Sequence, residues 1–446
     1  MPEPARPALG SSPLRWAVGL GLFGVLERIA LAWVYQPVAY GDTPTYFRLA
    51  GVLTAHGVAG YDATRVPGYP LFIAALGQEE TTVWLAQLAL GLLISLLVFF
   101  IAWRMTDRPS LALFSGLAYD LIAGQMLFEH VLLSETLATF LLLATIAGFL
   151  LLIRDPSSGS AIGLAVGIGL LASLTGMVRT LFFILPVVLF PFIMMAADRW
   201  RQRLLLAAAF SLPPLIILGG WIGFVYQHYG MMSPTTIGGY HLIQHTGAFF
   251  EYLPEQEAVI RDTYLAYRDQ QIADRGVQTN AIWEAIPELS ERTGLSFFAL
   301  SEKLQQLSIQ LIKEHPVLYL RSAAQGWLWF WKAPVYWQPD AMWQPVSRLM
   351  RIWAWVGRGV SLLANAAFLL LAAGIVLSQR LRARLRPTAP VVMLAGLVGA
   401  SSIVQTLVDH GDNPRFLMPL QMVVIVIVLW ASAAAWPVNP KNRVVR

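Results

Sequence analysis

The sequence contains no cysteine among its 446 residues. Disulfide bonds and thiolate metal sites are therefore excluded, and cysteine usage does not indicate a redox compartment. Charged side chains are also scarce, at 13% of the sequence, whereas a soluble globular domain carries roughly 25%. Hydrophobic residues make up 57%. Water is therefore not the main solvent of this chain.

Several short patterns do not predict the sites they resemble. No internal repeat or low-complexity tract is present. The Gly-x-Gly-x-x-Gly pattern over Gly19–Gly24 lies within an apolar run with no preceding strand, so it does not predict a nucleotide-binding loop. His241 and His245 lack the neighbouring acidic helix motif of a zinc site. Gly163 and Gly167 have the spacing of close helix packing, and we interpret them as structural.

Ten apolar runs have lengths suited to a membrane-spanning helix, which needs about 20 apolar residues. Because the bilayer core has no water to satisfy backbone groups, such runs must be helical. The sequence therefore predicts an all-α, polytopic transmembrane helical bundle. The predicted spans are Leu14–Tyr35, Val83–Trp103, Leu111–Phe128, Leu132–Ile153, Ala161–Met177, Thr180–Ala197, Leu204–Gln227, Ile352–Ser378, Val391–Val408 and Phe416–Trp436.

Cationic residues, which give the chain its net charge of +5, cluster on one side of these ten spans. The positive-inside rule assigns that side to the cytoplasm, so we predict that both termini are cytoplasmic. The first run lacks a clear cleavage site, and we interpret it as an uncleaved signal anchor. The clusters comprise Arg6, Arg15, Arg104, Arg108, Arg154, Arg199, Arg201, Arg203, Arg380, Arg382, Arg384, Arg386, Lys441, Arg443 and Arg446.

The aromatic segment His315–Trp337 is a possible eleventh span. As a span it would move the four-arginine connection after Ser378 to the outer side, against the positive-inside rule. We therefore predict a helix in the outer membrane interface, where tryptophan rings favour the headgroup level. A shallow span is the alternative, so the predicted count is 10 to 11.

Two outer segments are too long to be simple connections. The first segment, Gln36–Thr82, contains several prolines and predicts two short juxtamembrane helices, Pro44–Ala55 and Tyr69–Leu76. The second, His228–Glu314, has the composition of a soluble domain and predicts a small helical cap, with helical patterns at Glu255–Arg275 and Leu295–Lys313. The predicted organisation is a transmembrane module over 1–227 that includes 36–82, an extracytoplasmic cap over 228–314, and an interfacial helix with C-terminal spans over 315–446.

Most ionisable residues outside the cationic clusters gather in four outer connections. Loops are polar in most proteins, so this arrangement alone leaves a solvated surface and a functional cluster as alternatives. The residues concerned are Asp42, Arg48, Asp62 and Arg65 in the first segment, Glu129, His130 and Glu135 before the fourth span, Arg179 before the sixth, and Asp409, His410, Asp412 and Arg415 before the last.

Asp42 precedes Thr43 and Pro44 at the start of the first predicted short helix. Proline favours the first helical position, which makes Thr43 a suitable N-cap and leaves the Asp42 carboxylate free. Alternatively, Asp42 itself caps the helix, which would lower its pKa and weaken it as a base. On the local sequence alone we favour capping by Asp42.

Six motifs in chain order resemble the GT-C superfamily of membrane glycosyltransferases, especially the bacterial branch related to the protein O-mannosyltransferases of glycosyltransferase family 39. Each motif is loose, and their ordered succession over nearly the whole chain carries the resemblance. The motifs are Asp42; Arg65-Val-Pro-Gly-Tyr-Pro-Leu-Phe; Leu133-Ser134-Glu135-Thr136; Val178-Arg179 with Pro186; His315-Pro316 with Tyr319-Leu320; and Asn413-Pro414-Arg415-Phe416 with Pro419.

The resemblance implies a polyprenyl- or dolichyl-phosphate sugar as donor and inversion at the anomeric centre. It implies that Asp42 is the catalytic base and that Arg415, with Arg65 and Arg179, holds the lipid phosphate. These roles agree with general chemistry. A carboxylate that takes the acceptor proton contributes roughly 10²–10⁴-fold, and guanidinium groups bind phosphate oxygens bidentately. We therefore predict a hexosyl- or pentosyltransferase acting on a hydroxyl of a protein, glycan or lipid.

Relatives often carry two adjacent acids in the first segment, whereas Thr43 follows Asp42 here. Glu135 is predicted to supply a second catalytic carboxylate, with Glu129 as an alternative source, although an acid in the first turn of a helix, such as Glu135, also complements the helix dipole. No metal ligand or other cofactor is assigned, and a divalent cation is kept as an alternative. The residues predicted to contact the acceptor or the sugar are Tyr46, Tyr69, Glu129 and His410.

A membrane transporter or flippase of a sugar or lipid is the main alternative function. Transporters tend to have repeated halves and binding groups near the bilayer midplane, whereas ionisable residues here gather toward one face. An inactive superfamily member that serves as an assembly partner is a second alternative. The predicted partners are the lipid bilayer, the donor and the acceptor, with no nucleic acid. The predicted location is a bacterial inner or plasma membrane, with the active site on the extracytoplasmic side.

Overall fold

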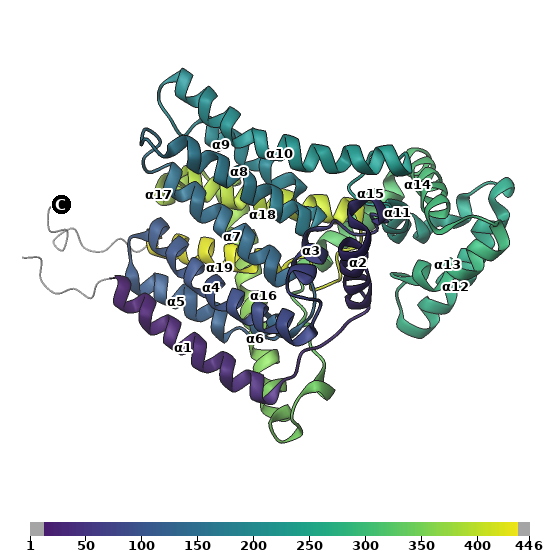
Figure 1. The fold of residues 1–446 in the computed structure, drawn as a ribbon, viewed down its shortest axis with the longest axis horizontal. Coiled ribbons are helices and arrows are strands. Elements are labelled where there is room, and N and C mark those ends of the chain that lie inside the picture. The colour runs from purple at the N-terminus through teal and green to yellow at the C-terminus, as the bar shows by residue number, and fades with distance from the viewer. Residues whose placement is uncertain (1–12, 436–446) are drawn as a thin grey trace, which may run out of the picture.

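A computed structural model describes residues 13–435, and within that range every named element is a helix, with only two isolated backbone bridges. Eight of its helices are long and apolar enough to cross a membrane, which confirms eight of the predicted spans and makes the chain an integral multi-pass membrane protein (Figure 1). These are α1 (Pro13–Val34), α4 (Glu80–Thr106), α7 (Glu135–Leu152), α8 (Ala161–Val178), α10 (Trp200–Tyr229), α16 (Ser347–Leu377), α18 (Ala389–Val408) and α19 (Met418–Ala435).

The other two predicted spans depart from single long helices. The third is broken at Ile122, whose extended backbone separates α5 (Pro109–Leu121) from α6 (Ala123–Met126) and η2 (Leu127–His130), with a bend of 60°. The sixth is shorter and consists of η3 (Thr180–Ile184) and α9 (Leu185–Met194). Pro191 lies inside α9 and removes a backbone donor there.

The segment predicted as an interfacial helix forms α15 (Pro316–Phe330), which has 15 residues. At 1.5 Å per residue such a helix is about 22 Å long, whereas a bilayer core is about 30 Å thick. By length, α15 is therefore not an eleventh span, and its place in the interface stays a prediction.

The described chain begins and ends at the same end of the bundle, which is the end away from the helices of residues 238–314 (Figure 1). This agrees with an even number of crossings, although the cytoplasmic assignment stays a prediction. The cations Arg6, Lys441, Arg443 and Arg446 of the predicted charge pattern lie outside the described residues. The four-arginine connection falls in and after α17 (Gln379–Leu385).

The first segment contains α2 (Thr43–His56), η1 (Gly57–Gly60) and α3 (Gly68–Ala75), which confirms both predicted short helices. Gly68 explains how α3 approaches the end of α8. A Cβ atom at Gly68 would lie 2.4 Å from the Met177 carbonyl oxygen, so only glycine fits. This contact brings the first segment close to the residue that precedes η3.

Residues 238–314 form the cap, which has a hydrophobic core of its own that includes Tyr240, Ile243, Leu289 and Leu300. The predicted helical patterns correspond to α12 and α14, whereas the sequence did not predict α11 and α13. The elements of the cap are α11 (Gly238–Thr246), η4 (Gly247–Tyr252), η5 (Glu255–Glu257), α12 (Ala258–Arg275), α13 (Ala281–Thr293) and α14 (Phe297–Glu314).

The glycine spacing in α8 did not identify the packed position. A Cβ atom at Gly163 or Gly167 would meet nothing within 4 Å, so the predicted close packing at these two glycines is wrong within the described chain. A Cβ atom at Gly169 would instead lie 2.1 Å from the carbonyl oxygen of Phe210 in α10. The face that meets α10 is therefore the one that carries Gly169.

Candidate active site

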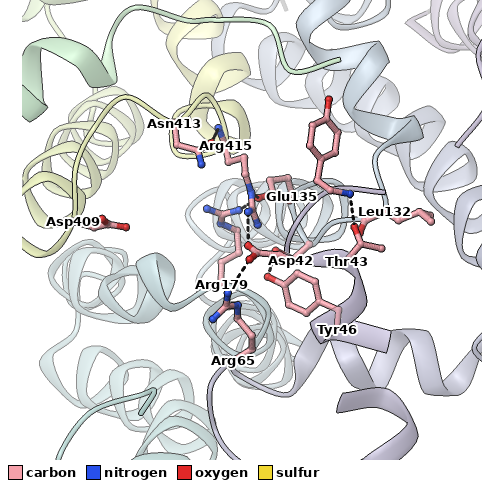
Figure 2. A network of polar contacts seen from close by, with 12 residues as sticks. Asp42, Thr43, Tyr46, Arg65, Leu132, Glu135, Arg179, Asp409, Asn413 and Arg415 are labelled. Atoms are coloured by element: carbon pink, nitrogen blue, oxygen red, sulfur yellow. Dashed lines mark hydrogen bonds and ion pairs between the residues drawn. The ribbon is translucent and has the colours of Figure 1, made fainter. Parts of the chain in front are cut away.

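Asp42 lies directly before α2, and its side chain makes no capping hydrogen bond. Its Oδ1 atom accepts a hydrogen bond from Arg65 Nη2 at 2.8 Å, and Oδ2 accepts one from Arg415 Nη1 at 2.5 Å (Figure 2). The favoured prediction that Asp42 caps the helix is therefore wrong. The Thr43 hydroxyl does not cap α2 either, because it accepts from the Tyr40 N–H at 3.0 Å and donates to the Leu132 carbonyl at 3.0 Å.

Glu135 is the first residue of α7 and is fully buried. Its Oε1 atom accepts hydrogen bonds from Arg415 Nε at 2.5 Å and from Arg179 Nη1. The Oε2 atom of Glu135 and the Nε atom of Arg179 are buried without a hydrogen-bond partner. Buried polar atoms are usually paired, so each of these two atoms has capacity for a further hydrogen-bond partner.

Arg415 connects the two carboxylates, because its guanidinium contacts Asp42 through Nη1 and Glu135 through Nε. Its side chain is 12% exposed, whereas that of Asp42 is 29% exposed. The cluster of three guanidinium groups and two carboxylates, shown in Figure 2, has a formal charge of +1. It therefore retains capacity for one further anion.

The arginines control the charge state of Asp42. Burial disfavours the carboxylate, but the guanidinium of Arg65 and then that of Arg415 outweigh burial and hold the pKa of Asp42 well below its usual range. Burial also opposes the charge on Arg415, yet Glu135 and Asp42 raise the pKa of Arg415 well above its usual value. Asp42 is thus ionised but a weak base while both arginines contact it.

Tyr46 and Tyr69 pack edge to face, with ring centroids 5.0 Å apart. The Tyr46 hydroxyl lies 3.4 Å from the Ser134 hydroxyl, next to Glu135 in the sequence. The Tyr69 hydroxyl donates to Gln87 Oε1 at 2.7 Å. Both tyrosines are buried, so they pack around the cluster, and their contact with a sugar or acceptor stays a prediction.

Glu129 is not part of the cluster, although the sequence predicted an acceptor or sugar contact there. Its carboxylate is fully buried and accepts hydrogen bonds from Arg28 Nε and Nη2 at 2.8 Å and 2.7 Å. Arg28 Nη1 also contacts Asp120 at 3.2 Å. This buried network joins α1 to α5 and η2. The sequence contains one signal for this network. Arg28 is an ionisable residue inside a predicted span, and such a residue needs a partner within the bundle.

His410 also lies outside the cluster. Its Nδ1 atom contacts Asp412, its ring packs 5.7 Å from that of Phe416, and its side chain is buried.

Among residues 13–435, no group of three or more His, Cys, Asp or Glu residues is arranged to hold a metal ion. Thus Asp42, Arg65, Glu135, Arg179 and Arg415 come together in the folded chain.

The fold is similar to those of solved membrane glycosyltransferases. The apo oligosaccharyltransferase of Archaeoglobus fulgidus matches with a TM-score of 0.52 at 13% identity, over 96% of this chain and 51% of that chain. The same enzyme tethered to an acceptor peptide gives 0.51 at 14% identity, over 93% and 49%. ArnT from Cupriavidus metallidurans bound to undecaprenyl phosphate gives 0.41 at 14% identity, over 95% and 78%.

The chain thus has a fold similar to that of the archaeal oligosaccharyltransferase, in agreement with the resemblance to the GT-C superfamily seen in the sequence. It spans about half the length of the archaeal enzyme. By sequence, no family model and no curated protein matches the chain.

Proposed function

We propose that the protein is an inverting glycosyltransferase that moves a sugar from a polyprenyl-phosphate donor to a hydroxyl acceptor at the extracytoplasmic membrane face. The observation that carries this proposal is the position of Arg415, whose guanidinium contacts both Asp42 and Glu135. A phosphate-binding cation and a carboxylate base then lie next to each other, as a transfer from a phosphate leaving group requires.

The three arginines suit the donor phosphate. The net charge of +1 favours one added anion, and the buried Nε atom of Arg179, which has no hydrogen-bond partner, supplies a free donor. Charge on the lipid phosphate grows as its bond to the sugar breaks, and fixed guanidinium groups stabilise that charge better in a buried site than in water. Carboxylate oxygens of Asp42 and Glu135 contact the guanidinium nitrogens that a phosphate would bind.

Donor binding would also activate Asp42. When a phosphate takes over Arg415, Asp42 loses one of its two cationic partners and its pKa rises toward the usual value. The acceptor oxygen then attacks the anomeric carbon while Asp42 takes the hydroxyl proton. The bond from that carbon to the phosphate oxygen breaks, and its electron pair leaves with the polyprenyl phosphate. Attack opposite the leaving group inverts the anomeric centre.

A transfer assay with purified protein in nanodiscs tests this proposal. The donors are a panel of polyprenyl-phosphate hexoses and pentoses, with nucleotide sugars for comparison. The acceptors are peptides, glycans and lipids; the peptide is included because the similar archaeal oligosaccharyltransferase was captured with an acceptor peptide. We expect transfer from a lipid-linked donor only. Transfer from nucleotide sugars alone would contradict the proposal.

The variant Asp42→Asn keeps the size of the side chain and removes the base. We expect kcat to fall by about 10²- to 10⁴-fold. Glu79→Gln is the matched control, because Glu79 is an exposed carboxylate of the same first segment. Full activity in Asp42→Asn would overturn the assignment of the base. Transport of a sugar or lipid by the purified protein, unchanged by Asp42→Asn, would favour the transporter alternative.

A further inference from the structure

The connection between α18 and α19 contains buried Asp409 and half-buried Asp412, followed by Arg415. We call residues Asp409–Phe416 the arginine turn. Its backbone is braced internally, because the His410 N–H donates to Asp409 Oδ1 at 2.8 Å and the Arg415 N–H donates to Asn413 Oδ1 at 3.1 Å. Figure 2 shows Asp409 apart from the carboxylates of the cluster, on the opposite side of this turn from Arg415.

The acids of the arginine turn contact the cap. Asp409 Oδ2 lies 3.0 Å from Nδ1 of His241 in α11. The Thr279 hydroxyl, which lies between α12 and α13, donates to Asp412 Oδ2 at 3.2 Å. Two separate parts of the cap therefore contact the two acids that flank His410.

The arginine turn is also closed on its third side by α15. A Cβ atom at Gly411 would lie 1.8 Å from the Gly326 carbonyl oxygen, so the two backbones are in direct contact. The turn lies between the cap and α15 with no room for a side chain at Gly411. Packed elements do not deform freely. A change in the contact between the cap and the turn therefore has to move the turn.

Asp409 depends on its two histidine partners. It is only 7% exposed. Burial disfavours its carboxylate, but His410 and then His241 outweigh burial and lower the pKa of Asp409 to about 2. A buried carboxylate that loses a partner is strongly destabilised. Loss of His241 would therefore release Asp409 from its position against α11.

We propose that Asp409 and His241 are positioning residues, through which the docked cap fixes the arginine turn and holds Arg415 in place for the donor phosphate. The inference rests on the proposed function, because it gives Arg415 the phosphate-binding role. Neither Asp409 nor His241 contacts the cluster of Asp42, so neither is a catalytic residue. The cap thus acts on donor affinity.

Two measurements test the inference, on the full chain in detergent. The first is hydrogen exchange of the arginine turn and α11, which needs no ligand and no activity. The second is the Kd for polyprenyl phosphate, the expected product lipid. The variants are Asp409→Asn, His241→Gln and the double variant. Lys303→Gln is the matched control, because Lys303 pairs with Glu257 at 2.6 Å within the cap and does not contact the turn.

We expect each single variant to speed exchange in both segments and to weaken polyprenyl phosphate binding by about 5- to 20-fold. The double variant should be little worse than either single one, because one contact carries both effects. Lys303→Gln should change neither measurement. In the transfer assay the KM for the donor should rise while the acceptor KM and kcat stay within about twofold.

Unchanged exchange in the single variants would overturn the inference, and so would additive effects in the double variant. Faster exchange with unchanged lipid affinity would show a cap contact without a positioning role, which also overturns it. If the wild-type protein binds no polyprenyl phosphate, the proposed function fails and the positioning role fails with it. The exchange data then still decide whether the cap contact holds the turn, so the two failures are distinguishable.

Discussion

The Nη1 atom of Arg415 lies 2.5 Å from Oδ2 of Asp42, although 373 positions separate the two residues in the chain. The contact joins the first segment to the arginine turn. It is the polar link between the part of the site that would hold phosphate and the part that would accept a proton. Five predictions follow from this arrangement and from the packing around it.

Arg415→Gln should lower kcat/KM for the donor by about 10²- to 10³-fold, the usual effect of removing one donor that stabilises developing charge. Arg415→Lys should restore little of this, because an ammonium cannot reproduce the fork that contacts Asp42 and Glu135 together. Steady-state kinetics with the lipid-linked donor measures both effects. Arg48→Gln is the control, since Arg48 is an exposed arginine of the first segment that lies outside the cluster. Wild-type rates in Arg415→Lys would contradict a bidentate role.

The pH dependence of kcat/KM should report the charge on Asp42. The arginines hold the pKa of Asp42 below its ordinary value of 3.8, so the base stays ionised as pH falls and causes no loss of rate above about pH 5. Arg65→Gln removes the stronger of the two cationic influences. The pKa of Asp42 then rises, and the acid limb of the profile should move to higher pH. A limb that stays in place or moves to lower pH would contradict this electrostatic account.

The same low pKa affects stability. The ion pairs of Asp42 contribute fully above the unfolded pKa, and their contribution is lost as pH falls through the folded pKa. Acid unfolding of the wild type should therefore begin at lower pH than that of Arg65→Gln, as unfolding at a series of pH values would show.

Arg28→Met should destabilise the protein by about 3–5 kcal/mol, because Glu129 and Asp120 would remain buried without their cation. Thermal or denaturant unfolding in detergent measures this loss. Arg15→Met on the same helix is the control, since Arg15 is exposed. Glu129→Gln should also lower stability and leave the acceptor KM unchanged. A raised acceptor KM at wild-type stability would instead support the sequence prediction of an acceptor contact at Glu129.

Gly169→Ala should lower stability, because its Cβ atom would lie 2.1 Å from the Phe210 carbonyl oxygen and force α8 and α10 apart. Overpacking of this kind costs typically about 1–3 kcal/mol. Gly163→Ala, on the same helix, should be neutral or slightly stabilising, because nothing lies within 4 Å of its Cβ atom. Equal unfolding temperatures for the two variants would show that α8 does not pack on α10 as described.

The sequence predicted the helical elements well where hydrophobic periodicity or length decides the structure. Eight spans, both short helices of the first segment and two cap helices were found in this way. The bend at Ile122 was missed because one extended residue leaves no periodicity signal. The packed glycine of α8 was missed because spacing alone does not say which face of a helix meets its neighbour.

The sequence predicted which residues make up the candidate site but not which of them contact one another. The ordered motifs pointed to Asp42, Glu135 and Arg415, yet nothing in the chain indicates that one guanidinium contacts both acids. Glu129 and Asp42 are similar as sequence features, since each is an acid at the outer end of a predicted span. Their different positions become clear only in the folded chain, where Arg28 of α1 binds the Glu129 carboxylate inside the bundle.

The order of the site residues along the chain has a consequence for biosynthesis. Asp42, Arg65, Glu135 and Arg179 are translated before the cap, whereas Arg415 lies between α18 and α19. A nascent chain therefore inserts two acids and two arginines long before it has the guanidinium that bridges the acids. Under the proposed function, competence for catalysis would arise only after α18 and the arginine turn have been made. A product that ends before Arg415 would carry four of the five site residues and lack the proposed activity.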